Sequence, residues 1–207
     1  MKQMRVGIVD TKFGSLYSIY KTIETLNDSV GLISEPKSIN NYDKLILPGT
    51  GNSSSVMKYL KDKGFYEEII RFKNSGNHIL GICVGMQILF KTSEEGNKSN
   101  CFNFFDSNII SLVKSTKIKT NIGWFRNSFE QSEHKLKKTL RPDPYFFFCH
   151  SYFADIEDKE KKYMVSNINN EINIASVVEK ENLLGVQFHP EKSQLNGQKL
   201  IEYFLNL

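Results

Sequence analysis

Two short segments carry the residue types from which a nucleophilic enzyme site could be built. In the first, Cys83 lies between Gly81 and Gly85, where an apolar run ends and a helical pattern begins. A strained strand-to-helix turn of this kind needs small residues on both sides of the nucleophile. Unpaired amide N–H groups at the helix N-terminus would favour the thiolate and make Cys83 a candidate nucleophile. The alternative, a small buried hydrophobic residue, does not account for the two glycines.

The second segment supplies the base that such a nucleophile lacks. His189 and Glu191 are separated by Pro190, which prevents a helix from continuing there. If the chain stays extended, side chains two residues apart project to the same side, so Glu191 can orient the imidazole and stabilise its protonated form. We expect His189 to exchange protons with Cys83 and with a leaving amine. Taken alone, His189 could equally be a structural residue, but a nucleophilic Cys83 requires a partner.

The elements that must position these residues follow from the hydrophobic pattern. The first half alternates short β-type runs with helical stretches, which predicts βαβ units and a parallel sheet. Predicted strands lie at 4–9, 30–33, 44–47 and 78–82, then at 109–113, 145–149, 163–167, 172–178 and 183–188. Predicted helices follow residue 15, surround 56–60 and 65–73, and close the chain at 197–205. Ser15 is a plausible N-cap for the first helix, and the aromatic run 145–148 is predicted to be a buried strand rather than a ligand platform.

The two segments resemble the class I glutamine amidotransferases, whose glutaminase domains use a Cys-His-Glu triad. The similarity lies in Gly-Ile-Cys-Val-Gly-Met-Gln at 81–87 and Gln-Phe-His-Pro-Glu-Lys-Ser at 187–193. Further segments occur in the order seen in the glutaminase subunits of imidazole glycerol phosphate synthases, at 6–10, 47–51, 122–124 and 150–152. The resemblance spans nearly the whole chain. It implies a flavodoxin-like, mostly parallel sheet flanked by helices, with an additional β-rich portion in the second half.

An oxyanion would form if Cys83 attacked a carboxamide, and backbone N–H groups could stabilise it. The amide of Val84 directly follows the nucleophile. A second donor could come from Gly49, Thr50 or Gly51, in a loop whose glycines allow an N–H to turn inward. By composition alone this loop could as well be an ordinary strand-to-helix turn. The resemblance favours the oxyanion role and implies that the loop completes the oxyanion hole only on a signal from the partner subunit.

Substrate-binding residues are implied by the resemblance only. The residues that would hold the α-amino and α-carboxylate groups of glutamine are Gln87, Glu95, Ser151 and Tyr152. A carboxylate such as Glu95 suits an ammonium group, and a hydroxyl or backbone donor near Ser151 suits a carboxylate. Each could instead be a surface or capping residue. His150 is not expected in the triad, because it and the adjacent Cys149 would face opposite ways in a strand.

The resemblance also implies a reaction and a partner. The Cys83 thiolate would attack the side-chain amide of glutamine, His189 would protonate the departing ammonia, and water would hydrolyse the γ-glutamyl thioester. Ammonia would pass internally to a (β/α)₈-barrel cyclase subunit, which makes imidazole glycerol phosphate and AICAR in histidine biosynthesis. The glutaminase is expected to be idle without this partner, and neither a cofactor nor a metal is expected.

Several loops depart from the family pattern, and other functions therefore stay open. The departures lie at 11–15, 52–53, 100–106, 120–121 and 125–126. They leave room for a paralogue that supplies ammonia to a sugar amidotransferase for cell-surface glycans. A non-catalytic scaffold of the same fold would have no chemical reason to keep the triad. A free-standing thiol hydrolase would be expected to carry an insertion that forms a broad cleft.

Length and composition limit the remaining classes of fold, cellular location and partner. With 207 residues, 40% of them hydrophobic, the chain can bury the core of one domain over residues 1–207. No apolar run approaches the roughly 18 residues of a membrane span, and we expect a cytoplasmic protein. Three cysteines without metal-type spacing support neither a disulfide framework nor a zinc site. The net charge of +4 comes from scattered lysines, so no nucleic acid or membrane partner is expected.

Overall fold

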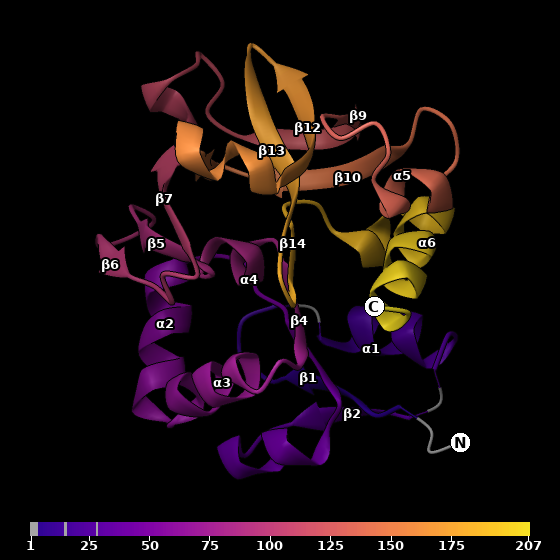
Figure 1. Cartoon of the computed structure of the whole chain (residues 1–207). Coiled ribbons are helices and arrows are strands. Elements are labelled where there is room, and N and C mark those ends of the chain that lie inside the picture. Colours follow the sequence, from indigo (N-terminus) through magenta and orange to yellow (C-terminus); the bar gives the residue numbers. More distant parts are fainter. Residues whose placement is uncertain (1–3, 15, 28) are drawn as a thin grey trace.

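Parallel strands joined by crossover helices form the centre of the molecule (Figure 1). The computed structural model describes residues 4–14, 16–27 and 29–207. The main sheet has the strand order β2-β1-β3-β4-β14-β13-β12-β9. Its strands are β1 (Val6–Val9), β2 (Val30–Ile33), β3 (Lys44–Leu47), β4 (His78–Ile82), β9 (Ser128–Phe129), β12 (Met164–Asn170), β13 (Ile172–Lys180) and β14 (Leu183–Val186). Neighbours from β2 to β14 are parallel, and the pairs beyond β14 are antiparallel. The predicted parallel sheet is confirmed.

Helices cover both faces of the parallel strands, and every residue of β1, β3 and β14 is therefore buried. In Figure 1, α2 (Ser53–Asp62) and α3 (Phe65–Asn74) lie on one side of β4 and β14, and α1 (Leu16–Glu24) and α6 (Gln194–Leu205) lie on the other. The predicted N-cap Ser15 falls outside the described residues. In the part of the chain that the structure describes, no helix is both long enough and apolar enough to cross a membrane.

Most of the remaining elements, from residue 84 onward, lie around one end of the main sheet (Figure 1). One sheet has the order β11-β7-β5-β6, with β5 (Phe90–Ser93), β6 (Ser99–Asn100), β7 (Phe105–Ser111) and β11 (Tyr152–Asp155). Strand β8 (Asn121–Arg126) pairs with β10 (Tyr145–His150). Two short α-helices are α4 (Val84–Gln87) and α5 (Lys135–Thr139). The 3-10 helices are η1 (Pro36–Asn41), η2 (Leu112–Lys114), η3 (Asp158–Tyr163) and η4 (Pro190–Lys192). The strand predicted at 109–113 begins earlier, at Phe105, and ends at Ser111, where η2 follows.

The aromatic strand β10 is buried on one face only, which corrects the expectation of a buried strand. Phe146 and Phe148 are fully buried, and the ring of Phe146 stacks on that of Phe188 with centroids 3.9 Å apart. Tyr145 and Phe147 lie on the opposite face, where Tyr145 is 49% exposed. Helices cover both faces of the main sheet, whereas the β8–β10 pair packs on the core with one face alone.

Candidate active site

Two neighbouring strands bring the predicted nucleophile and base together. β4 and β14 are parallel and in register, with Ile82 opposite Val186 (Figure 1). Because parallel strands end at the same edge of a sheet, the residues that follow them meet there. Cys83 directly follows β4, and its backbone N–H donates to the carbonyl of Val186 at 2.8 Å. His189 follows β14 by three residues and lines the same cavity as Cys83.

The turn that carries Cys83 is strained and tightly packed. Cys83 has φ of 55°, a conformation that L-residues rarely adopt and that persists only where the surroundings impose it. A Cβ atom on Gly85 would lie 1.7 Å from the carbonyl oxygen of Leu47, and one on Gly81 would lie 2.6 Å from the carbonyl oxygen of Gly85. Both glycines are therefore needed for close backbone approach, as the sequence predicted.

His189 is held between a carboxylate and the thiol. Its Nδ1–H donates to Glu191 Oε1 at 2.9 Å, and both side chains are at most 5% exposed. The other ring nitrogen is then left for the hydrogen bond to Cys83. Burial disfavours the charged ring, but the hydrogen bonds to Cys83 and Glu191 outweigh it and raise the pKa of His189 to about 10. The arrangement therefore favours a protonated imidazole at neutral pH, beside the candidate nucleophile.

The second histidine of this region, His150, has the opposite electrostatic setting. It is buried, Asn121 Nδ2 donates to its Nε2 at 3.0 Å, and its Nδ1–H donates to the carbonyl of Tyr152 at 2.9 Å. Burial lowers the pKa of His150 to about 4, and the positive charge of His189 adds to this effect. His150 is therefore neutral at physiological pH, with both ring nitrogens engaged.

Histidine titration by NMR offers a direct check, because the chain has only four histidines. We expect the His189 ring to stay protonated up to about pH 10 and the His150 ring to stay neutral down to about pH 4. In Cys83→Ser, we expect the pKa of His189 to fall, because the ring loses its hydrogen bond and Coulombic interaction with Cys83. A wild-type His189 that titrates near its ordinary value of about 6.5 would contradict the ion pair.

A cavity of about 160 Å³ surrounds the sulfur and gathers most of the predicted site. Its lining includes the predicted residues Thr50, Gly51, Cys83, Val84, Gln87, Glu95 and His189, and also Cys149, His150 and Lys192. Gly49 lies behind this lining, since a Cβ atom there would be 3.0 Å from the Cβ of Val84. Gly51 has φ of 80°, which glycine adopts without strain. The loop 49–51 thus lies against the residue that follows the nucleophile.

The predicted substrate residues divide into two groups. Gln87 and Glu95 line the cavity. Gln87 Nε2 donates to the carbonyl of Tyr152 at 3.0 Å, and its Oε1 is buried with no hydrogen-bond partner among the described residues. Ser151 and Tyr152 are not among the lining residues, and the Ser151 hydroxyl lies 2.9 Å from that of Thr120. Their role in binding glutamine stays a prediction.

Glu95 is anchored at the start of α2. Its Oε2 accepts from the backbone N–H of Ser53 at 3.0 Å, so the carboxylate lies at the positive end of a helix. Burial raises the pKa of Glu95, and the hydrogen bonds from Ser53 oppose that rise. A carboxylate that is fixed in this way in the cavity of Cys83 can accept hydrogen bonds from an ammonium group.

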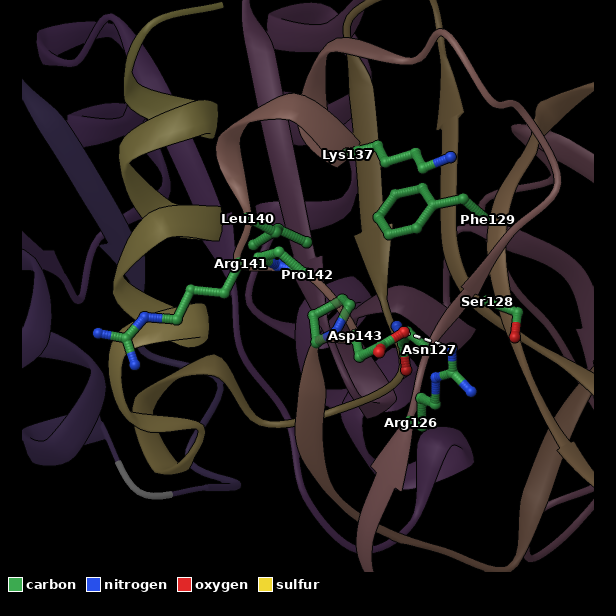
Figure 2. A pocket seen from close by; sticks show the side chains of 10 residues that line it. Arg126, Asn127, Ser128, Phe129, Lys137, Leu140, Arg141, Pro142 and Asp143 are labelled. Carbon is green, nitrogen blue, oxygen red and sulfur yellow. Dashed lines mark hydrogen bonds and ion pairs between the residues drawn. The ribbon is translucent and has the colours of Figure 1, made fainter.

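A larger cavity of about 510 Å³ lies elsewhere and lacks the thiol and imidazole groups of the predicted site (Figure 2). Its lining contains neither cysteine nor histidine. The side chains of Arg126 and Asp143 form an ion pair there, and Figure 2 shows Arg141 directed away from the other labelled side chains. Size alone would therefore point to the wrong site.

Comparison with known proteins decides the family. The family model for class-I glutamine amidotransferases matches residues 9–206. The chain belongs to the class I glutamine amidotransferases. Among its relatives in this family, the "Imidazole glycerol phosphate synthase subunit HisH" of Caldanaerobacter subterraneus subsp. tengcongensis is 35% identical over 199 residues, with 96% of each chain covered. The protein of the same name from Buchnera aphidicola subsp. Acyrthosiphon pisum is 36% identical, with 99% of this chain and 100% of the relative covered. Within the class I amidotransferases, the chain therefore belongs with the HisH proteins.

Solved structures agree on the fold of this class I amidotransferase. A structure described as "Structure of PurLQS from Thermotoga maritima" matches with a TM-score of 0.77 at 18% identity, covering 99% of this chain and 98% of the other. Another, described as "Crystal structure of glutamine amidotransferase", matches with a TM-score of 0.74 at 16% identity, covering 97% of each chain. The predicted fold class is confirmed.

Two residues near the sulfur were missed from the sequence. Lys192 lines the cavity, and Gln187 is fully buried with its Nε2 3.8 Å from Cys83 Sγ. Both lie in the segment 187–193, which contains the predicted base His189. The position of Gln187, two residues before His189, was a sequence signal that it lies near the site.

Proposed function

We propose that this chain is the glutaminase subunit of an imidazole glycerol phosphate synthase, which hydrolyses glutamine to glutamate and ammonia for histidine biosynthesis. One observation carries the chemistry. The adjoining ends of β4 and β14 bring Cys83 and His189 to one small cavity, and Glu191 is hydrogen-bonded to His189. The identity of more than 30% over nearly the full length of HisH proteins supports the pathway.

The proposed reaction uses each group of the cavity in turn. The Cys83 thiolate attacks the side-chain amide carbon of glutamine, and His189 protonates the leaving nitrogen as the C–N bond breaks and ammonia departs. Water, deprotonated by His189, then attacks the γ-glutamyl thioester, and glutamate leaves as the sulfur recovers its electron pair. Glu191 keeps the imidazole oriented throughout.

The proposed oxyanion hole combines two backbone sources. The N–H of Val84 is at the first position of α4, where it has no intrahelical acceptor. The loop Gly49, Thr50 and Gly51 lies against it and is proposed to supply the second N–H. Loss of one such donor typically costs about 3 to 4 kcal/mol of barrier. A loop that presents its donor only after partner binding would keep the isolated glutaminase idle.

The proposed partner is a (β/α)₈-barrel cyclase subunit, and β8 and β10 offer a face for it. Trp124 lies opposite Phe147 and Ile122 lies opposite Cys149 in the strand register, so these side chains share one face. Ile122 and Trp124 are 60% and 45% exposed. Adjacent exposed apolar side chains of this size are typical of interaction sites. Because Cys149 and His150 of β10 also line the cavity, a cyclase bound here would lie beside the point where ammonia forms.

Co-expression with the barrel cyclase tests the proposed function. We expect the purified pair to convert glutamine to glutamate at a rate that rises strongly when the phosphoribosyl substrate of the cyclase is present, and the chain alone to be nearly inactive. Imidazole glycerol phosphate should form with glutamine as the nitrogen source. A pair that uses added ammonia but never glutamine would refute the glutaminase role.

Truncation of Trp124 tests the proposed docking face. We expect Trp124→Ala to weaken binding of the cyclase about 30-fold, the effect of losing roughly 2 kcal/mol at an aromatic hot spot. Isothermal titration calorimetry with the purified cyclase measures the change. Leu32→Ala is the matched control, since Leu32 is 50% exposed but lies on β2 at the far edge of the main sheet. Equal affinities of both variants would place the interface elsewhere.

A further inference from the structure

Gln187 is a buried polar side chain that the proposed reaction does not use. It is 0% exposed and lies between β14 and His189. Its backbone N–H donates to the carbonyl of Ser176 at 2.9 Å, so the chain is still paired with β13 at this point. The chain bends at 187–188, and the side chains of Gln187 and His189 both reach Cys83. Gln187 Nε2 lies 3.8 Å from Cys83 Sγ, within range of an N–H···S hydrogen bond.

The direction of this hydrogen bond is set by a chain of amides that starts at a backbone carbonyl. The carbonyl of Tyr152 can only accept, and the amide group that faces it at 3.0 Å must therefore be Gln87 Nε2. The same Nε2 donates to Gln187 Oε1 at 3.1 Å. Gln187 Nε2 is then left to face the sulfur. Each amide orientation follows from the one before it.

A sulfur that carries negative charge gains from such a donor. Hydrogen bonds to an ionised acceptor are about twice as strong as neutral ones, and they favour the charged form. The protonated His189 also acts on this sulfur, but it is proposed to serve the leaving group as well. Gln187 is the neighbour that has no other chemical task.

We propose that Gln187 is a positioning residue that donates a hydrogen bond to the Cys83 thiolate and holds it for attack. The role of the thiolate rests on the proposed function. Because Gln187 is oriented by Gln87, the proposed glutamine-binding residue is also connected to the nucleophile through two hydrogen bonds. Binding of glutamine at Gln87 would therefore change the hydrogen bond that the sulfur receives.

The test measures how the rate of Cys83 alkylation by iodoacetamide depends on pH, in the full-length chain, by mass spectrometry. Gln187→Met keeps the length of the side chain and removes the donor. We expect it to shift the midpoint of the pH–rate profile upward by about one unit, so that alkylation at a pH below both midpoints slows about tenfold. Gln198→Met, on the exposed side of α6, makes the same chemical change as a control and should follow the wild type.

Three results would overturn the proposal: an unchanged profile in folded Gln187→Met, a lower plateau with an unchanged midpoint, or the same shift in the control. A lower plateau alone would show altered access to the sulfur. If Gln187→Met does not fold, Gln187→Glu serves instead: it keeps an acceptor for Gln87, removes the donor and adds a negative charge that repels the thiolate, so a shift of more than one unit is expected. Alkylation requires no glutamine turnover. A chain without glutaminase activity but with a Gln187-dependent profile would therefore refute the proposed function and leave this inference standing.

Discussion

Replacing Cys83 by alanine is expected to reduce glutamine hydrolysis by the two-subunit enzyme about 10⁴-fold or more. The substitution removes the atom to which the γ-glutamyl group would be transferred, and no other side chain in the cavity replaces it. Cys149 also lines the cavity but lies on the exposed face of β10, and its neighbour His150 has both ring nitrogens engaged. Glutamate release in the presence of the cyclase measures the loss.

A matched control and a second readout make this result specific. Cys101→Ala also removes a buried thiol, but Cys101 lies away from the cavity and bonds to the carbonyl of Ser99. It should keep nearly full turnover. With ammonia supplied directly, the Cys83→Ala enzyme should still make imidazole glycerol phosphate, because the cyclase is untouched. Full glutamine-dependent turnover in Cys83→Ala would refute the nucleophile.

Replacing His189 by asparagine is expected to reduce the same activity about 10³-fold, within the range known for loss of general acid–base catalysis. The asparagine amide can still donate to Glu191, so the buried carboxylate keeps a partner and the fold should be retained. The ionisable ring that protonates ammonia is lost. Initial rates of glutamate release from pH 6 to 9, with the cyclase present, measure the effect.

The double variant shows whether the two residues act as one unit. Groups of one catalytic unit are strongly non-additive, so Cys83→Ala combined with His189→Asn should cost little more than Cys83→Ala alone. His78→Asn, at the opposite end of β4, is the control for histidine loss and should stay active. Two losses that multiply in the double variant would mean that the residues act independently.

The strands in the first half of the chain could be predicted from the sequence because they depend on local hydrophobic patterns. The predicted strands 30–33, 44–47 and 78–82 agree with β2, β3 and β4 at both ends. Their residues are nearly all apolar, because a parallel sheet is covered on both faces, and helical patterns separate them. Strands β5, β6, β8, β9 and β11 were missed. They are short or mixed in composition, and β8, β9 and β11 also pair with segments far along the chain.

Strand β10 shows a similar limit of prediction from local sequence patterns. Four consecutive aromatic residues, 145–148, were predicted to be buried together, yet they alternate between the core and an exposed face. The pattern could not reveal this, because aromatic residues suit both a core and an interaction surface. Only the packing of β8 and β10 on one side of the core separates Phe146 from Tyr145.

The sequence by itself determined the chemical types and their local geometry: a cysteine between close-packed glycines, a histidine two residues before a carboxylate, and the strands before each. The tertiary structure alone decided that β14 is the parallel neighbour of β4, which unites the two halves of the site. It also decided that Gln187 faces the sulfur and that His189 and His150 have opposite charge preferences. These outcomes depend on burial and on contacts between distant residues, which local sequence patterns do not encode.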